Sequence, residues 1–239
     1  QSIPNADGGQ SFHIQNLYAA YAVSDKFTLT AGYMGTFIGY EVISPLANFQ
    51  YSTSYLFTNG PFQNAGVKGT YAFSSKVSLM AGLFNDQWNT YKATPEFGLN
   101  AFGAQLSVTP AEGLTAYFNL LTGSESGTIV DLTAAYQISP KFKLGLNAAD
   151  FSGPVTGTGY SGVALYPSVT ISGSFGLGLR AESFKSKTTD TSVSAFTLSA
   201  NLKSGGLTFI PEIRLDSASE DRRRNRRVRR RNARSRRLS

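Results

Sequence analysis

Residues 26–85 read KFTLTAGYMGTFIGYEVISPLANFQYSTSYLFTNGPFQNAGVKGTYAFSSKVSLMAGLFN, and this stretch decides the fold. Apolar residues occupy every second position in three runs, at residues 27–33, 65–73 and 77–83, with small or polar residues between them. A period of two is the side-chain period of a β-strand, so each run has one apolar and one polar face. Only three residues separate the last two runs, which is the length of a hairpin turn. The stretch therefore predicts antiparallel strands, with residues 37–62 as a long loop.

The same alternation recurs along the chain and predicts about twelve strands and no helix. Tight turns are expected near positions 25, 75, 111, 140, 173 and 205. Longer loops are expected at residues 37–62, 85–96, 122–128, 151–160 and 185–192. Short turns on one rim and long loops on the other are typical of outer-membrane barrels, and strands of about 10 residues match a tilted bilayer crossing.

The polar face distinguishes this fold from a soluble β-sandwich, which would also show the alternation. In a sandwich that face would be the outer surface, yet it carries mostly Gly, Ser, Thr, Asn and Ala rather than Lys and Glu. Only 15% of the residues are charged. The predicted fold class is therefore all-β, an antiparallel up-and-down transmembrane β-barrel.

The strand count predicts that this barrel is incomplete. If the tight turns are periplasmic, both the first and the twelfth strand end on the extracellular rim. Single-chain bacterial barrels have even strand numbers, and they normally keep both ends in the periplasm. We therefore expect residues 11–216 to be part of a barrel with at least 14 strands, preceded by a loop at residues 1–10.

The net charge of +7 comes from the end of the chain. Residues 222–239 hold 11 of the 22 basic residues and no acidic one, which leaves 11 basic against 15 acidic residues before them. The tail at residues 217–239 has three interpretations: a phosphate-binding segment for nucleic acid or lipopolysaccharide, a disordered charged run, or a non-native sequence that replaces a strand. The abrupt change in composition at Asp221 favours the last. Nucleic acid is not an expected partner.

Residues for catalysis or metal binding are scarce. The chain has no cysteine and one histidine, His13, which is too few for a metal cluster and leaves any catalytic triad resting on that single residue. Asn85 and Asp86, near Trp88, are a weak candidate for a calcium site. We predict no enzyme activity, no catalytic or metal-ligating residues and no cofactor.

Three sequence segments resemble a known family: FIGYEVISPLANFQYSTSYLF at residues 37–57, NGPF at residues 59–62 and GVKGTYAFSSKVSLMAGLFN at residues 66–85. They are similar to Putative beta-barrel porin-2, a family of outer-membrane porins of Bacteroidetes-type bacteria. The resemblance covers residues 11 to about 216, but only residues 37–85 are distinctive. It implies a barrel in the outer membrane of a Gram-negative bacterium, with its signal peptide removed, that passes small solutes without chemistry.

The parity of the apolar rows assigns a set of charged side chains to the inward face, and we predict these as pore-lining: Lys68, Asp131, Lys143, Arg180, Glu182, Glu212 and Arg214. On the lipid face such charges would cost about 2–4 kcal/mol each. Two roles are compatible. The charges can pair across neighbouring strands of the wall, and they can form the field that sorts solutes in a water-filled pore.

The loop at residues 37–62 contains enough apolar residues to fold inward, so it is the candidate constriction or plug. Its constriction residues are predicted to be Tyr40, Glu41, Phe49, Tyr51, Tyr55 and Phe57. An exposed cap that packs on neighbouring loops is the alternative for the same segment.

The predicted function is an outer-membrane porin that allows passive diffusion of small hydrophilic solutes through a polar lumen. The alternative is a non-conducting barrel that acts as an adhesin or envelope scaffold. Expected partners are outer-membrane lipid, lipopolysaccharide and small hydrophilic solutes, and a homo-oligomer stays open.

Overall fold

The protein is described by a computed structural model, which places residues 15–89 and 98–220. Thirteen strands of these residues form one antiparallel sheet. The strands are β1 Leu17–Ser24, β2 Phe27–Gly35, β3 Gln63–Ser74, β4 Val77–Phe84, β5 Ala101–Ala111, β6 Leu114–Gly123, β7 Gly127–Gln137, β8 Phe142–Ser152, β9 Gly159–Ser172, β10 Phe175–Ser186, β11 Thr191–Ser204, β12 Leu207–Phe209 and β13 Glu212–Glu220.

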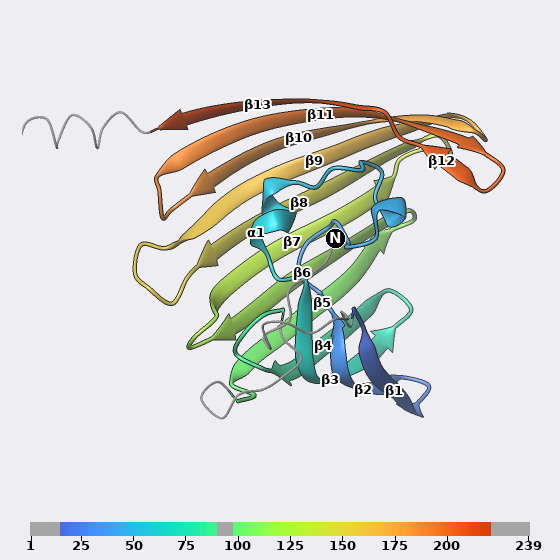
Figure 1. The fold of residues 1–239 in the computed structure, drawn as a ribbon. Coiled ribbons are helices and arrows are strands. Elements are labelled where there is room, and N and C mark those ends of the chain that lie inside the picture. Colours follow the sequence, from blue (N-terminus) through green and yellow to red (C-terminus); the bar gives the residue numbers. More distant parts are fainter. Residues whose placement is uncertain (1–14, 90–97, 221–239) are drawn as a thin grey trace, which may run out of the picture.

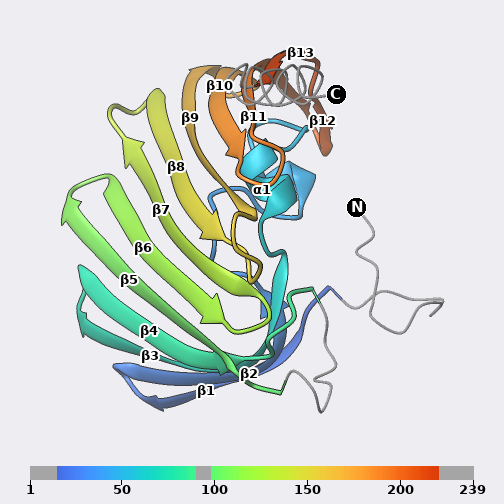
Figure 2. The same ribbon diagram turned by 90° about the vertical axis from the view of Figure 1, so that its left-hand side faces the viewer.

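From β1 to β12 each strand pairs with the next one along the chain, and β13 pairs with β11 beside β12, so the sheet is an up-and-down meander (Figure 1). Its strands curve round one side of the molecule, and Figure 2 shows a deep concave face that is open opposite β6 and β7. Strands β1 and β13 form the two edges, and among the described residues no ladder joins them. The observed fold is thus the all-β, antiparallel wall of a barrel that is not closed.

The two faces of the sheet have opposite chemistry, and in the sense expected of a membrane barrel. On β11, Leu198 of the convex face is 51% exposed, whereas its neighbours Thr197 and Ser199 on the concave face are 0% and 1% exposed. Exposed Leu, Val and Phe recur on the convex side of most strands, while the buried polar residues face inward. An apolar outer band around a polar interior is the arrangement that lipid requires of a spanning barrel.

The last predicted strand differs from the structure in two ways. Pro211 divides it into β12 and β13, which both pair with β11. Proline has no N–H to donate to a ladder, so an interruption at this edge is its usual effect. Strand β13 also continues to Glu220, so residues 217–220, which the sequence assigned to the tail, belong to the sheet.

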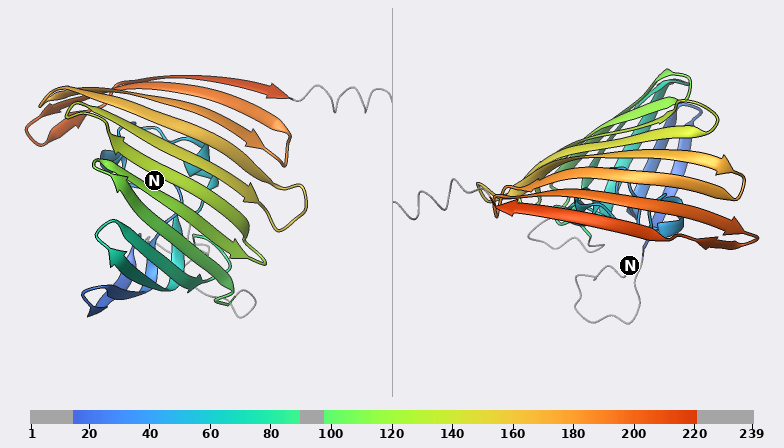
Figure 3. Two further views of the ribbon diagram at one scale, coloured as in Figure 1. Left: turned by 180° about the vertical axis from the view of Figure 1, so that it is seen from behind. Right: turned by 90° about the horizontal axis from the view of Figure 1, so that it is seen from above.

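The six tight turns lie where the sequence predicts them, but only two loops are long. Residues 36–62 and 85–100 connect β2 to β3 and β4 to β5. The other three predicted loops shrink to residues 124–126, 153–158 and 187–190. The reason is that polar residues at the strand ends continue the ladders, as in the pairs Thr122↔Thr128 and Lys185↔Ser192. Both rims of the sheet are visible at once in the rear view of Figure 3.

The long loop contains the two helices of the described residues, where the sequence predicted none. These are a 3-10 turn, η1 Pro45–Ala47, and a short helix, α1 Tyr55–Asn59. The Ser54 side chain caps α1 by accepting a hydrogen bond from the Phe57 N–H at 3.0 Å. No helix among the described residues is long and apolar enough to span a membrane.

Candidate functional site

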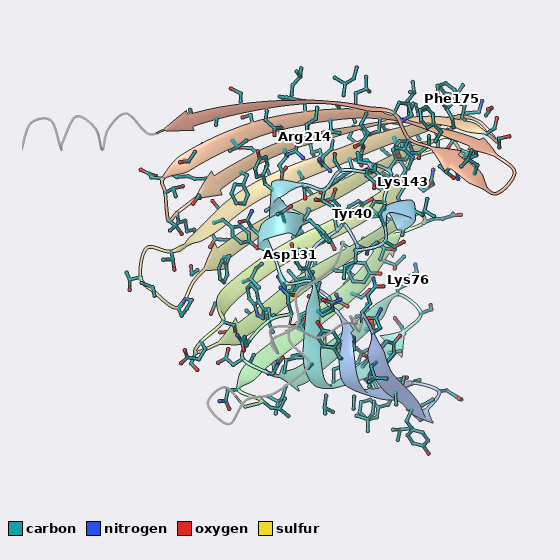
Figure 4. The ribbon with its side chains drawn as sticks, in the orientation of Figure 1. Tyr40, Lys76, Asp131, Lys143, Phe175 and Arg214 are labelled. Atoms are coloured by element: carbon teal, nitrogen blue, oxygen red, sulfur yellow. The ribbon has the colours of Figure 1, made fainter. Side chains whose placement is uncertain are left out.

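The loop at residues 36–62 lies within the concave face and contacts the wall along most of its length. Figures 2 and 4 show η1 and α1 inside the curve of the sheet, in front of β7 to β10. The predicted inward fold of this loop is therefore confirmed, and the alternative of an exposed cap is wrong. Its role as a constriction or plug stays a prediction.

Arg180 of β10 is the central attachment point of the loop. Its side chain is 0% exposed and forms an ion pair at 2.8 Å with Glu41. The same guanidinium donates hydrogen bonds to the main-chain oxygens of Ser52 and Thr53, at 2.6 and 3.1 Å, and to Thr197 of β11 at 3.1 Å. The planar guanidinium of arginine can thus bind a segment of the loop and a strand of the wall at the same time.

Two carboxylates of the wall bind main-chain N–H groups of the loop. Glu182 accepts hydrogen bonds from the N–H groups of Tyr55 and Leu56, at 2.9 and 2.8 Å. Glu212 does the same for Tyr51 and Ser52, both at 2.8 Å. The N–H groups at the start of a helix lack intrahelical partners, so Glu182 satisfies the first turn of α1.

Asp131 of β7 holds the beginning of the loop. Its carboxylate accepts hydrogen bonds from the Gly39 N–H at 3.0 Å, from the Asn119 amide at 2.7 Å and from the Asn147 amide. The next residue, Tyr40, stacks on Tyr166 with ring centroids 4.6 Å apart. Burial, helped by the charge of Glu41, raises the pKa of the Tyr40 phenol.

Glycines on the concave face make room for the aromatic rings of the loop. A Cβ atom on Gly145 would overlap the Tyr40 ring, and one on Gly178 would overlap the Phe49 ring. Phe49 is further held by its main-chain oxygen, which accepts a hydrogen bond from Asn201 at 2.9 Å. These positions were missed in the sequence. The sequence feature that could have identified them is a glycine at an inward-facing position of β8 and of β10, where the other inward-facing residues are mostly polar.

The other aromatic constriction residues divide between buried and exposed. Tyr55 donates a hydrogen bond to Asp216 at 3.0 Å, and the Arg214 guanidinium lies 5.0 Å from its ring centre. Phe57 is buried and packs against Phe62. Tyr51 is 63% exposed, so it is the member of the set whose ring is open to the space beside the loop.

The predicted wall charges, all among the described residues, do not form ion pairs with one another across neighbouring strands; most of them bind the loop instead. Arg180, Glu182 and Glu212 bind the loop, and Arg214 pairs with Asp216 of its own strand at 2.8 Å and donates to the Thr53 oxygen at 2.9 Å. The structure places all seven predicted residues on the inward parity. Their part in lining a pore stays a prediction.

Lys68 and Lys143 are the two members that do not hold the loop. No described carboxylate lies within ion-pair distance of either ammonium group. Lys68 is half-buried on β3. Lys143, at the start of β8, lines a cavity of about 540 Å³ between the loop and the wall. A second cavity, of about 530 Å³, runs along the loop beside Arg214.

The Asp86 carboxylate, which the sequence offered as a candidate calcium ligand, holds two connecting segments together by hydrogen bonds, and we call this contact the latch. Its carboxylate is 1% exposed and accepts four hydrogen bonds: from the Ser124 hydroxyl at 2.9 Å, the Glu125 N–H at 3.0 Å, and the Ser126 N–H and hydroxyl at 2.9 and 2.5 Å. These donors use the acceptor sites of both oxygens. The carboxylate joins the loop after β4 to the turn between β6 and β7.

This latch has a predictable pH dependence. Burial opposes ionisation of Asp86, but the hydrogen bonds from Ser126, Glu125 and Ser124 outweigh it, and the pKa of Asp86 lies below its ordinary value. The stabilisation is therefore present above the unfolded pKa of about 3.9 and is lost as the pH falls through the lower folded pKa.

We expect Asp86→Asn to lower the free energy of unfolding by about 1–3 kcal/mol at neutral pH, because it leaves buried donors facing an amide. Urea unfolding of the refolded protein measures this. The difference from wild type should shrink as the pH falls below the ordinary Asp pKa of about 3.9 and through the lower folded pKa. Asp190→Asn is the control, since Asp190 forms only an exposed ion pair with Lys185. Equal effects of the two variants would contradict the latch.

Three sequence features lie outside the described residues. The predicted loop at residues 1–10, His13 and the arginine-rich segment from Asp221 onward belong to ranges whose structure is not described. The three interpretations of the arginine-rich segment therefore remain predictions from the sequence.

Comparisons with known proteins agree with this geometry. A family model described as "Putative beta-barrel porin-2, OmpL-like" matches residues 1–236. No curated protein matches the chain. Among solved structures, an anion-selective porin from Comamonas acidovorans is similar with a TM-score of 0.58 and 14% identity, over 80% of this chain and 64% of that one.

Two further structures show the same architecture. The outer-membrane channel DcaP of Acinetobacter baumannii has a TM-score of 0.53 and 11% identity, over 80% of this chain and 70% of that one. OprD of Pseudomonas aeruginosa has a TM-score of 0.51 and 13% identity, over 80% and 56%. At these identities the likeness establishes the fold. The chain spans 64% of the Comamonas porin and 56% of OprD.

Proposed function

The chain belongs to the Putative beta-barrel porin-2, OmpL-like family, and on that basis we propose that the complete gene product is a passive channel for small hydrophilic solutes. Family membership and the porin fold point to the outer membrane of a Gram-negative bacterium. The proposal includes contact with outer-membrane lipid and lipopolysaccharide, and it assigns no chemical step to any residue.

The observation that carries the proposal is the loop held inside a polar concavity. Five inward-facing side chains, Asp131, Arg180, Glu182, Glu212 and Arg214, bind residues 39–56 by hydrogen bonds of 2.6–3.1 Å. A loop fixed in this way inside a polar lumen narrows it and sets which solutes pass, which is what a channel requires.

A non-conducting scaffold is the second candidate, and one observation favours it. The long-loop end of the concave face holds an apolar cluster that includes Leu56, Phe84, Leu121 and Phe184. Apolar side chains packed in this way can close a lumen to water. In that case the loop is a plug and the outer surface is the working part.

The proposal predicts that the complete gene product, refolded into liposomes, makes them permeable to small sugars. The swelling rate should fall steeply as the sugar becomes larger, because the loop narrows the path. Refolding is checked by heat-modifiable gel mobility. Folded barrels that give no swelling with the smallest sugar would contradict the channel and leave the scaffold.

A further inference from the structure

The cavity beside Lys143 has a composition that the passive channel alone does not explain. It measures about 540 Å³ and lies between residues 46–50 of the loop and the ends of β8 to β11 nearest the tight turns. In Figure 4, Lys143 and Tyr40 lie in this part of the concave face. Its volume is in the range of sites that bind small molecules.

The charged groups around this cavity are unbalanced. Lys143 and Lys203 both line it, and neither has a carboxylate partner in the described part of the chain. The one carboxylate of the lining is Glu41, and both of its oxygens are engaged: Oε1 with Arg180 at 2.8 Å, and Oε2 with the Ser54 N–H at 2.8 Å and hydroxyl at 2.6 Å. Two ammonium groups therefore face the cavity without a counter-charge.

A buried donor without a partner points to the same site. Gln50 is 2% exposed and lines the cavity, and its side-chain Nε2 has no hydrogen-bond partner in the structure. A buried amide donor left unpaired costs free energy, so an acceptor from a bound molecule would be stabilising once the Gln50 side chain turns its Nε2 into the cavity. Hydroxyl groups of Ser168 and Thr170 on β9 add further donors to the lining.

Part of the loop side of the cavity is apolar. Leu46 and Phe49 supply this part of the lining. Phe49 is seated over Gly178, so its ring is fixed in place. An inorganic anion makes no use of such a surface, whereas a molecule with a negative group and an apolar body uses both sides.

We propose that this cavity binds small organic carboxylates, with Lys143 and Lys203 as the charge partners, Gln50 as a neutral donor, and Leu46 and Phe49 as the apolar contact. This inference rests on the proposed channel function and names a solute class for it. The site lies on the side of the loop that faces the tight turns. There it would raise the local concentration of anions next to the constriction.

Benzoate is the probe, with benzamide as its neutral counterpart of the same shape and inorganic phosphate as an anion without an apolar body. Binding to the complete, detergent-refolded protein is measured by titration calorimetry. Benzoate should bind at least about tenfold more tightly than either benzamide or phosphate, because only benzoate uses both halves of the lining.

The variant Lys143→Gln with Lys203→Gln should weaken benzoate binding about tenfold or more and leave benzamide binding unchanged. The control is Lys76→Gln, since Lys76 lies in a tight turn away from the cavity (Figure 4), and it should bind benzoate like wild type. Gln50→Glu adds a negative charge to the lining and should abolish benzoate binding while the barrel still shows heat-modifiable mobility.

The outcomes separate this inference from the channel proposal. Sugar-induced swelling together with no benzoate binding, or with binding that survives loss of both lysines, would overturn the inference and leave the channel. Phosphate binding equal to benzoate binding would overturn the organic part of it. Lysine-dependent benzoate binding in a barrel that gives no swelling would support the site and overturn the channel.

Discussion

Arg180→Met is expected to lower the free energy of unfolding by about 3–5 kcal/mol and to release residues 36–62 from the wall. Arg180 is 0% exposed and Glu41 is 5% exposed, so loss of the guanidinium leaves a buried carboxylate without its cation. It also leaves the main-chain oxygens of Ser52 and Thr53 without their donor. Urea unfolding measures the loss of stability. Limited proteolysis with chymotrypsin measures the release, because residues 36–62 contain aromatic cleavage sites but no Lys or Arg.

Two further variants make this prediction specific. Lys143→Met removes a cation that has no carboxylate partner among the described residues, so its effect on unfolding should be small. Glu41→Gln combined with Arg180→Met removes the stranded charge as well and should recover part of the lost stability. If Arg180→Met behaves like Lys143→Met, with the loop still protected from chymotrypsin, Arg180 is not the attachment point.

The inward face of the wall could be predicted from the sequence because side-chain direction in a strand is a local property. Alternation places the side chains of Asp131 and Val130 on opposite faces of the sheet, and in the structure Asp131 is 2% and Val130 is 58% exposed. The same rule assigned Arg180 and Glu182 to the inward face. The tight turns were equally predictable, since three or four residues with turn-forming side chains decide each of them.

What these charges contact could not be predicted in the same way. Arg180 and Glu41 are 139 residues apart in the sequence, and Glu212 and Tyr51 are 161 residues apart. No local pattern encodes such a contact, and the more local expectation of pairing between adjacent strands was wrong for this reason. The glycines under the loop, Gly145 and Gly178, show the same limit, because their role depends on rings that arrive from residues 40 and 49.

The predictions of the loop boundaries and of a chain without helices were wrong for a different reason. Strand ends rich in Ser, Thr and Gly read as loops, yet the neighbouring strand continues their ladder, as in Gly123↔Gly127. Helix α1 has five residues, too short for a periodic signal. It is held from outside its own sequence by Glu182, whose carboxylate satisfies the N–H groups of Tyr55 and Leu56.

Replacement of residues 36–62 by a two-residue Asn-Gly turn is expected to raise single-channel conductance several-fold without unfolding the barrel. The ladder of β2 and β3 continues to the pair Gly35↔Gln63, so a hairpin turn can close it directly. The loop then no longer occupies the concave face. Arg180, Glu182 and Glu212 would become hydrated side chains of a wider lumen. Conductance in planar bilayers measures the change, and heat-modifiable gel mobility confirms folding of both proteins.

The comparison of these two proteins tests most directly the central claim that the loop at residues 36–62 is fixed inside the lumen of a channel. The account predicts stable ohmic steps for the complete, refolded gene product and clearly larger steps for the protein with the Asn-Gly turn. Equal conductance of the two folded proteins would contradict the placement of the loop in the path. Silence of both would contradict the channel itself.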